Sequence, residues 1–329
     1  MRRVKLELCY DGGEYAGWQI QKKQPNVRTI QEELEKAIRR VVGADVEVLG
    51  SGRTDAGVHA LYQVAAFSTE SALPCETLTR AINAFLPPDV RIWRSTDVAE
   101  GFHPIRDVVR KRYRYLLSDA RPAFPFWRRN VWNLRERFDD EAALEAAKFL
   151  VGTFDFAAFQ TQGSPRKTTV RTVYDVRVER RSVADAFAFP KLRSGALGAS
   201  DASNGTSVEA ARAPIETPTL ISVEVEADGF LYNMVRTIVG TLFWFSTRHK
   251  GFENPETMRK IVASADRSQA GPTAPPWGLY MLDVVYPDER QTRKTAEIGE
   301  ASASQTADVE ERTGENEASA SRFSEETTY

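Results

Sequence analysis

The sequence predicts an α+β fold. Short segments in which apolar and polar side chains alternate, as expected of half-buried strands, recur along the chain. Between them lie segments with an apolar stripe at helical spacing, and the two kinds follow one another in mixed order. The 329 residues, 42% hydrophobic and 27% charged, have the composition of an ordinary globular protein of about two domains.

The first third of the chain has predicted strands on either side of a capped helix. Residues 4–10 alternate apolar with polar side chains and predict a strand. Thr29 and Glu32 have the capping-box spacing that satisfies free N–H groups at a helix start, and Gly43 predicts the end of that helix. Further strands are expected over 45–49, 62–68 and 91–98, and a further helix over 76–85.

The middle of the chain contains a strand in which aromatic and basic residues alternate. Its period of two places Tyr113 on one face and Arg112 and Arg114 on the other. These arginines could face solvent over a tyrosine core, or they could contact a ligand. Later segments predict helices over 140–151, 230–245 and 256–263, and strands over 172–180, 220–227 and 279–286. Arg236 interrupts the apolar helix and needs a partner or a cleft, because burying an unpaired charge is costly.

Charge is unevenly distributed along the chain. Residues 288–329 carry eleven acidic and five basic side chains, a net of −6, so the total of −2 leaves +4 for residues 1–287. Ten basic and three acidic residues fall within 106–137, which is compatible with a phosphate-rich partner. The Ala, Ser, Thr and Glu repetition of 288–329 predicts a disordered acidic tail, and the composition of 182–217 predicts a flexible insertion.

Several classes of protein and site are disfavoured. No apolar run approaches the ~20 residues of a membrane helix, and the first residues do not resemble a signal peptide, so we expect a cytoplasmic protein without a membrane partner. Two cysteines give no disulfide framework. No P-loop or dinucleotide fingerprint occurs, and the histidines and cysteines lack zinc-ligand spacing. A Ser-His-Asp triad stays open, although no nucleophile-elbow pattern is present.

The residues 50–60, Gly-Ser-Gly-Arg-Thr-Asp-Ala-Gly-Val-His-Ala, are the strongest candidate for a functional site. Three glycines there indicate a tight loop or a close approach of the backbone, and they frame Arg53 and Asp55. The loop could be a polar turn between two strands or a prepared site. In the second case Asp55 could act as a nucleophile or a general base without a cofactor, with Arg53 paired to it.

The nine residues 52–60 closely resemble the signature loop of the TruA family of tRNA pseudouridine synthases. The resemblance continues in the same order through six further segments and spans nearly all of residues 1–287. These segments are Tyr-Asp-Gly at 10–12 with Gly-Trp-Gln at 17–19, Phe-His at 102–103, Lys-Arg-Tyr-Arg-Tyr at 111–115, Phe-Asp-Phe at 154–156, Gly-Phe-Leu-Tyr-Asn-Met-Val-Arg at 229–236, and Thr-Ala-Pro-Pro at 273–276 with Leu-Tyr at 279–280.

The resemblance implies an enzyme that isomerises uridine to pseudouridine at positions 38 to 40 of the tRNA anticodon stem-loop. The family's catalytic aspartate falls on Asp55, and the loop arginine that pairs with it and helps displace the target base falls on Arg53. The tyrosine that stacks on the flipped uracil falls on Tyr113, and a further partner of the aspartate falls on Arg236. Basic residues beside Tyr113 are candidates for RNA binding, namely Arg110, Lys111, Arg112 and Arg114.

The implied fold has two similar α+β domains whose antiparallel sheets meet at a basic cleft, usually within a homodimer, and the reaction needs no cofactor and no metal. We place the domains at 1–105 and 106–287. The chain departs from the family after His103, where Pro104 and Ile105 replace the common Ala-Arg. Two alternatives stay open, a catalytically silent RNA-binding protein and a pseudouridine synthase that acts on another RNA.

Overall fold

The computed structural model describes residues 1–21, 26–121, 123, 125–161, 168–182 and 219–287. The predicted acidic tail over 288–329 lies outside the described residues, as does the predicted insertion apart from its first residue. The chain divides into two compact units, Met1–Val284 and Val285–Tyr329. The described helices and strands belong to the first unit, except that the last strand ends at Val285. The division into domains at residue 105 falls in the connection between strands β4 (Val90–Val98) and β5 (Arg110–Ser118) and stays a prediction.

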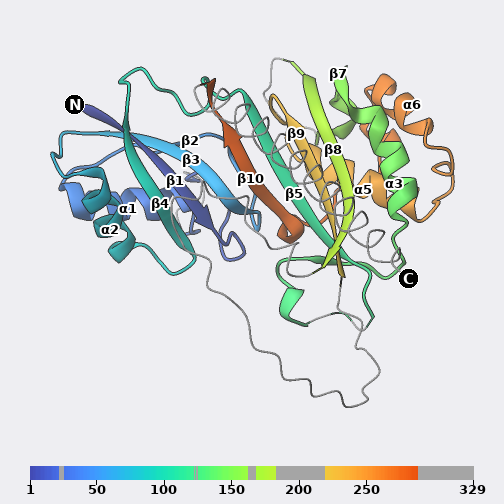
Figure 1. Cartoon of the computed structure of the whole chain (residues 1–329), viewed down its shortest axis with the longest axis horizontal. Helices are drawn as coiled ribbons and strands as arrows, with labels where there is room; N and C mark the ends of the chain where they lie inside the picture. Colours follow the sequence, from blue (N-terminus) through green and yellow to red (C-terminus); the bar gives the residue numbers. More distant parts are fainter. Residues whose placement is uncertain (22–25, 122, 124, 162–167, 183–218, 288–329) are drawn as a thin grey trace, which may run out of the picture. The chain divides into compact units, whose positions relative to one another are not determined.

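The described strands form one ten-stranded sheet, and this mixture of sheet and helices confirms the α+β class (Figure 1). Its main order is β4-β1-β3-β10-β5-β9-β8-β7, with β2 on β3 and β6 on β5. Most of the pairings with a defined register are antiparallel. The strands are β1 (Arg2–Tyr10), β2 (Leu49–Gly50), β3 (His59–Thr69), β4 (Val90–Val98), β5 (Arg110–Ser118), β6 (Trp132–Asn133), β7 (Gly152–Asp155), β8 (Val170–Ser182), β9 (Thr219–Ala227) and β10 (Leu279–Val285).

Helices accompany both halves of the sheet. In Figure 1, α1 (Ile30–Val42) and α2 (Cys75–Phe85) lie beside β1–β4, while α3 (Asp140–Ala147), α5 (Met234–Ser246) and α6 (Thr257–Ser264) lie beside β5–β9. The predicted cap of α1 is present, because the Thr29 side chain accepts a hydrogen bond from the Glu32 N–H. Gly43 ends this helix at a φ of 75°, a left-handed conformation that glycine adopts without strain.

Strand β10 joins the two halves of the sheet. It is the last strand in the sequence, yet it lies between β3 and β5. Tyr280 and Met281 of β10 pair in parallel with His59 and Ala60 of β3, and the rings of Tyr280 and His59 stack with centroids 4.8 Å apart. The two halves that the resemblance implies are therefore continuous through one strand near the end of the described chain.

Two predicted elements differ from those observed. The strand expected over 45–49 is reduced to β2, because the N–H of Val48 bonds to the Glu35 carboxylate of α1 and not to a neighbouring strand. The helix expected from residue 230 begins only at Met234, because Asn233 has a left-handed φ of 61°. The short strands β6 and β7 were not predicted; β6 pairs with the preceding strand β5, and β7 pairs with the following strand β8.

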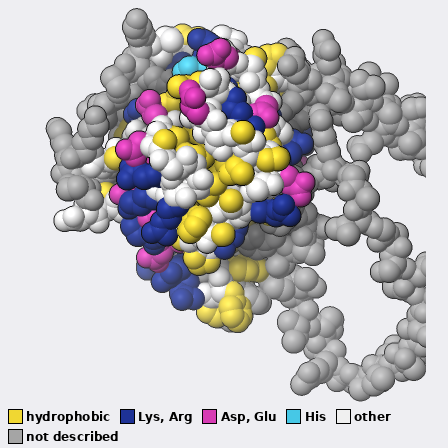
Figure 2. Space-filling view, turned by 90° about the vertical axis from the view of Figure 1, so that its left-hand side faces the viewer, with side chains coloured by type: hydrophobic (Ala, Val, Ile, Leu, Met, Phe, Trp, Pro, Cys, Tyr) yellow, Lys and Arg dark blue, Asp and Glu magenta, His cyan; other side chains and the backbone are white. Residues whose placement is uncertain are grey.

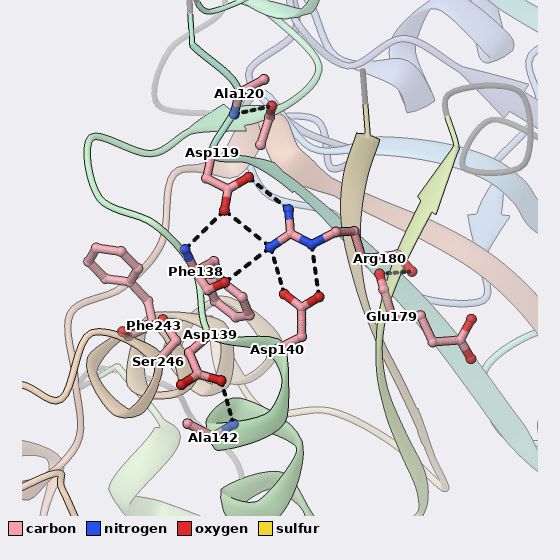
Figure 3. Close-up of polar contacts among 12 residues, drawn as sticks. Asp119, Ala120, Phe138, Asp139, Asp140, Ala142, Glu179, Arg180, Phe243 and Ser246 are labelled. Atoms are coloured by element: carbon pink, nitrogen blue, oxygen red, sulfur yellow. Dashed lines mark hydrogen bonds and ion pairs between the residues drawn. The ribbon is translucent and has the colours of Figure 1, made fainter. Parts of the chain in front are cut away.

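An arginine network holds the start of α3 against the sheet, as Figure 3 shows. The Arg180 guanidinium on β8 donates to both carboxylate oxygens of Asp119 at 2.8 and 3.1 Å and to both of Asp140 at 2.9 Å. It also donates to the carbonyl of Phe138 at 3.0 Å. A pocket of about 480 Å³ opens beside this network, and no residue of the loop that carries Asp55 lines it. The pocket is lined by Arg137, Phe138, Asp139, Asp140, Arg180 and Ser246.

The face at the α1 and α2 end of the sheet carries charges of both signs, with hydrophobic side chains among them (Figure 2). Two basic side chains at this end have acidic partners, since Lys36 pairs with Glu32 at 2.8 Å and Arg39 pairs with Asp45.

Candidate active site

The loop that carries Asp55 connects β2 to β3, as the sequence predicted. It is packed tightly against the loop after β1, and glycines make the contact possible. A Cβ on Gly17, which has a φ of +94°, would lie 2.6 Å from the carbonyl oxygen of Thr54. A Cβ on Gly12 would lie 1.9 Å from the carbonyl oxygen of Val58. These two glycines of the neighbouring loop therefore shape the site as much as those within it.

A buried hydrogen-bond network supports the loop from behind. Gln63 of β3 is fully buried, donates to the Gly52 carbonyl at 2.9 Å and accepts from the Ser51 hydroxyl at 2.5 Å. The hydroxyl groups of Tyr10 and Thr54 are 2.8 Å apart. Sequence reasoning missed Gln63, although a lone glutamine within the apolar strand β3 is the kind of buried polar group that must have partners.

Strand β5 contributes a lysine to the same loop. The Nζ of Lys111 donates to the Ser51 carbonyl at 2.5 Å, and it lies 3.1 Å from the position that a Cβ on Gly52 would take. A larger residue than glycine at position 52 would therefore press on this ammonium group. Lys111 thus connects the second half of the sheet to the backbone just before Asp55.

Asp55 forms an ion pair with Arg236 of α5. Its Oδ2 lies 3.6 Å from Nη1, and the two side chains are 32% and 15% exposed. Burial raises the pKa of the Asp55 carboxyl, and the positive charge of Arg236 opposes part of that rise. The contact that the resemblance implied between these two residues is present, and it places a guanidinium beside a carboxylate that remains open to a substrate.

The guanidinium of Arg236 has two further contacts at shorter distances. Its Nε donates to the Ala274 carbonyl and its Nη1 donates to Oδ1 of Asn233, both at 2.7 Å. The N–H of Ala274 returns a hydrogen bond to the Arg236 carbonyl at 3.1 Å. The orientation of the guanidinium is therefore fixed by its own half of the sheet, independently of Asp55.

Tyr113 of β5 lies close to the carboxylate, as expected from its place in the motif. Its side chain is buried and packs edge-on against Phe230, with ring centroids 4.9 Å apart. Burial raises the pKa of the Tyr113 phenol, and the neighbouring Tyr10 and Asp55 raise it further. The phenol is therefore neutral at physiological pH, and its ring is held in a fixed orientation.

Arg53 occupies a different position from the one expected of it. Its side chain is exposed and makes neither an ion pair nor a hydrogen bond with any residue that the structure describes. The expected pairing with Asp55 is not formed, because Arg236 holds the place beside the carboxylate. Arg53 is consequently available for contact with another molecule.

The remaining basic residues of β5 are paired across the sheet. Arg110 and Arg112 both bind Glu226 of β9, and Arg114 donates to Glu224 at 2.8 Å. Although burial raises the pKa of Glu226, hydrogen bonds from the two arginines bring it below its usual value. Arg114 is only 6% exposed, and its contact with RNA stays a prediction.

His59, at the end of the loop, connects three segments of the site. Its Nε2 lies 3.1 Å from the Trp277 carbonyl, next to β10, and its Nδ1 lies 2.9 Å from Oδ1 of Asp11. Nδ1 also accepts a hydrogen bond from the Gly12 N–H at 3.1 Å. The contact with His59 lowers the pKa of Asp11, although burial opposes this. Among the described residues, no three His, Cys, Asp or Glu side chains gather into a group that could hold a metal ion.

Comparison with known proteins identifies the family. A family described as tRNA pseudouridine synthase matches residues 9–104 and 146–287, which include Asp55 and Arg236. The chain belongs to this family. Proteins named tRNA pseudouridine synthase A are 38% identical in a Thermoanaerobacter species (strain X514), 37% in Acetivibrio thermocellus and 35% in Geotalea daltonii. Each match covers 87% of this chain and 100% of the relative.

The match between this chain and other tRNA pseudouridine synthases ends close to residue 287, where the described residues also end. Within those described ranges, none of the helices has the length and apolar character required to cross a bilayer.

Proposed function

We propose that the chain isomerises uridine to pseudouridine in tRNA, with Asp55 as the catalytic carboxylate. The observation that carries the proposal is the pairing of Asp55 with Arg236 on a tightly supported loop, in a member of the tRNA pseudouridine synthase family. The carboxylate is only partly exposed, and a neighbouring cation favours its ionised form. An ionised, oriented carboxylate is the group that attack or proton abstraction at a ribose requires.

The target uridine lies inside a base stack, and reaching its C1′ and C5 atoms requires it to flip out at a cost of a few kcal/mol. The exposed Arg53 offsets part of this cost by entering the space that the base leaves. Tyr113 then stacks on the uracil, because its ring is already held against Phe230 and little freedom is lost. Arg110, Lys111 and Arg112 are partly exposed and supply positive charge to the RNA backbone.

Asp55 next assists cleavage of the bond between C1′ and N1, either by attack on C1′ or by abstraction of a ribose proton. The freed uracil rotates and C5 bonds to C1′. In the first route this breaks the bond between Asp55 and C1′, and in the second the ribose proton is returned from Asp55. The C5 proton is then lost to solvent, and N1 gains a proton. The reaction is an isomerisation and consumes no oxidant, reductant or cofactor. We place it at positions 38 to 40 of tRNA, in the cytoplasm, with the protein acting as a homodimer.

Tritium release from tRNA labelled at C5 of uridine tests the assignment. The wild-type chain should release tritium, and Asp55→Asn should reduce the rate by at least about a thousandfold, because the amide can neither attack nor accept a proton. Asp45→Asn is a matched control, since Asp45 is 79% exposed and pairs only with Arg39 among the described residues. Undiminished release by Asp55→Asn would refute the role of Asp55.

The two alternatives give different results in companion experiments. A silent RNA-binding protein would bind tRNA in a salt-sensitive manner and form no pseudouridine. A synthase for another RNA would leave the uridines at nucleotide positions 38 to 40 of tRNA unmodified. Mapping pseudouridine in RNA from a deletion strain, with and without the restored protein, distinguishes all three.

A further inference from the structure

We infer that Asn233 is a positioning residue that holds the Arg236 guanidinium at a set separation from Asp55. This inference rests on the proposed function of Asp55. Asn233 lies at the start of α5 and connects Arg236 to a segment of the chain that contains no other part of the site.

The backbone of Asn233 explains part of the residue choice. Its φ of 61° lies in the left-handed region, which asparagine tolerates better than most residues with a side chain. This conformation turns the chain sharply into α5, and the Asn233 carbonyl accepts the hydrogen bond from the Thr237 N–H at 2.9 Å. Glycine would satisfy the backbone requirement equally well, so the side chain must be explained separately.

The side chain uses both ends of its amide. Oδ1 accepts from Nη1 of Arg236 at 2.7 Å, and Nδ2 lies 3.0 Å from Oγ1 of Thr161, to which it donates. A guanidinium can only donate, so Oδ1 must face Arg236 and Nδ2 must face Thr161. Glycine can make neither contact, and aspartate could make both only with the Thr161 hydroxyl as donor and with a second negative charge on the guanidinium. Asparagine makes both contacts without adding a charge beside Asp55.

The distances show what this arrangement does at the site. Nη1 of Arg236 is 2.7 Å from Asn233 but 3.6 Å from Asp55. The Ala274 carbonyl, also at 2.7 Å, holds Nε on the same guanidinium. Arg236 therefore acts on Asp55 as a nearby fixed charge and not as a tight hydrogen-bond partner. Asn233 prevents the guanidinium from closing onto the carboxylate, which leaves the carboxylate oxygens available to the substrate.

The dependence of kcat on pH separates this role from a purely structural one. Asn233→Gly keeps the backbone conformation and removes the restraint, so Arg236 should close onto Asp55 and stabilise its ionised form. We expect kcat to fall about tenfold, KM for tRNA to change by less than about twofold, and the acidic limb of the kcat profile to move to lower pH. Asn233→Asp places a second carboxylate on the guanidinium, so the same limb should move to higher pH.

The groups that face Asp55 are limited in number. Arg236 faces it from α5, Tyr113 faces it from β5, and the charged Arg53 and Lys111 belong to or contact its own loop. Neither substitution at Asn233 changes a contact of Tyr113, Arg53 or Lys111. Opposite shifts of the acidic limb in the two variants are therefore assigned to Arg236.

Asn254→Gly is the matched control, because Asn254 accepts a hydrogen bond from the Glu256 N–H at 2.9 Å near the start of α6. It should leave kcat and its pH profile unchanged, and thermal melting verifies that every variant is folded. A folded Asn233→Gly with wild-type kcat, or shifts of the same sign in both variants, would overturn the inference. An inactive wild-type chain would instead overturn the proposed function and, with it, the inference.

Discussion

The charge on Asp55 is only partly supported by its surroundings. Burial disfavours the ionised form, and the single cation within 4 Å in the described chain is Arg236 at 3.6 Å. A carboxylate in this state is more basic than one in water, which suits attack or proton abstraction. The site therefore gives up some folding stability in exchange for reactivity.

This balance predicts the pH dependence of the reaction. The pKa of Asp55 is raised in the folded protein, and the reaction needs the ionised form, so kcat should rise with pH through a value above the ~3.9 of an ordinary aspartate. Arg236→Met removes the opposing charge, and the acidic limb should move to still higher pH. Single-turnover rates between pH 4 and 9 measure this shift; an unmoved limb in Arg236→Met would contradict it.

At the scale of residues, the side chains of the site could be predicted from the sequence, but their hydrogen-bond and ion-pair partners could be predicted only in part. Asp55, Tyr113 and Arg236 belong to short motifs that the sequence displays directly. Gln63 and Asn233 act through hydrogen bonds to residues distant in sequence, which a single sequence does not reveal. In the structure Asp55 pairs with Arg236 and not with Arg53, because proximity along a loop does not fix the direction of a side chain.

Helix α5 positions Arg236 through a close contact with the segment before β10. A Cβ on Gly240 would lie 1.7 Å from the carbonyl oxygen of Pro272, and Ala274 in the same segment binds Arg236. Alanine normally favours a helix over glycine by about 1 kcal/mol. Here the clash outweighs that gain, so Gly240→Ala should destabilise the protein by about 1–3 kcal/mol and also lower kcat.

Urea unfolding and tritium release measure the two effects of Gly240→Ala. Gly101→Ala is the matched control, since a Cβ there would meet no atom within 4 Å. Stability and kcat equal to those of wild type in the Gly240 variant would show that α5 and this segment can separate without consequence.

The hydrogen bonds of Arg180 connect the start of α3 to β8, in the half of the sheet that does not carry Asp55 (Figure 3). Although burial opposes it, hydrogen bonding from Arg180 lowers the pKa of Asp119, so the ionised form stabilises the fold. This stabilisation is present above the unfolded pKa of an aspartate, ~3.9, and is lost as pH falls through the lower folded value. Asp119→Asn should cost about 1–3 kcal/mol at pH 7, and the difference should shrink progressively below pH 4. A cost independent of pH in urea titrations would argue against this.

At the scale of elements, periodicity and caps located the long helices and strands. The capped helix α1 and the alternating strand β1 were confirmed, since each is specified by its own residues. The strand over 45–49 was largely wrong, because Glu35 of α1 takes the hydrogen bond that a neighbouring strand would have supplied. The place of β10 between β3 and β5 depends on long-range pairing, which local patterns do not encode.

For the whole molecule, the sequence predicts that residues 288–329 are dispensable for the reaction. A chain ending at Pro287 loses a net charge of −6 and carries +4. It should keep its melting temperature within about 3 °C and its kcat, and it should bind tRNA at least as tightly at low salt. Melting curves, tritium release and filter binding across a salt series measure the three effects, and a large loss of activity would refute the prediction.

The central place of β10 has a consequence during translation. A ribosome delivers the chain from the N-terminus, so the Asp55 loop emerges long before Ala274 and the strand that follows it. Until β10 has emerged, the nascent chain lacks the strand that joins its halves, and Arg236 lacks the carbonyl that orients it. We expect chains stalled before residue 279 to be inactive towards RNA. The pairing of β10 with β3 and β5 is then the step of synthesis that completes the sheet beneath the site.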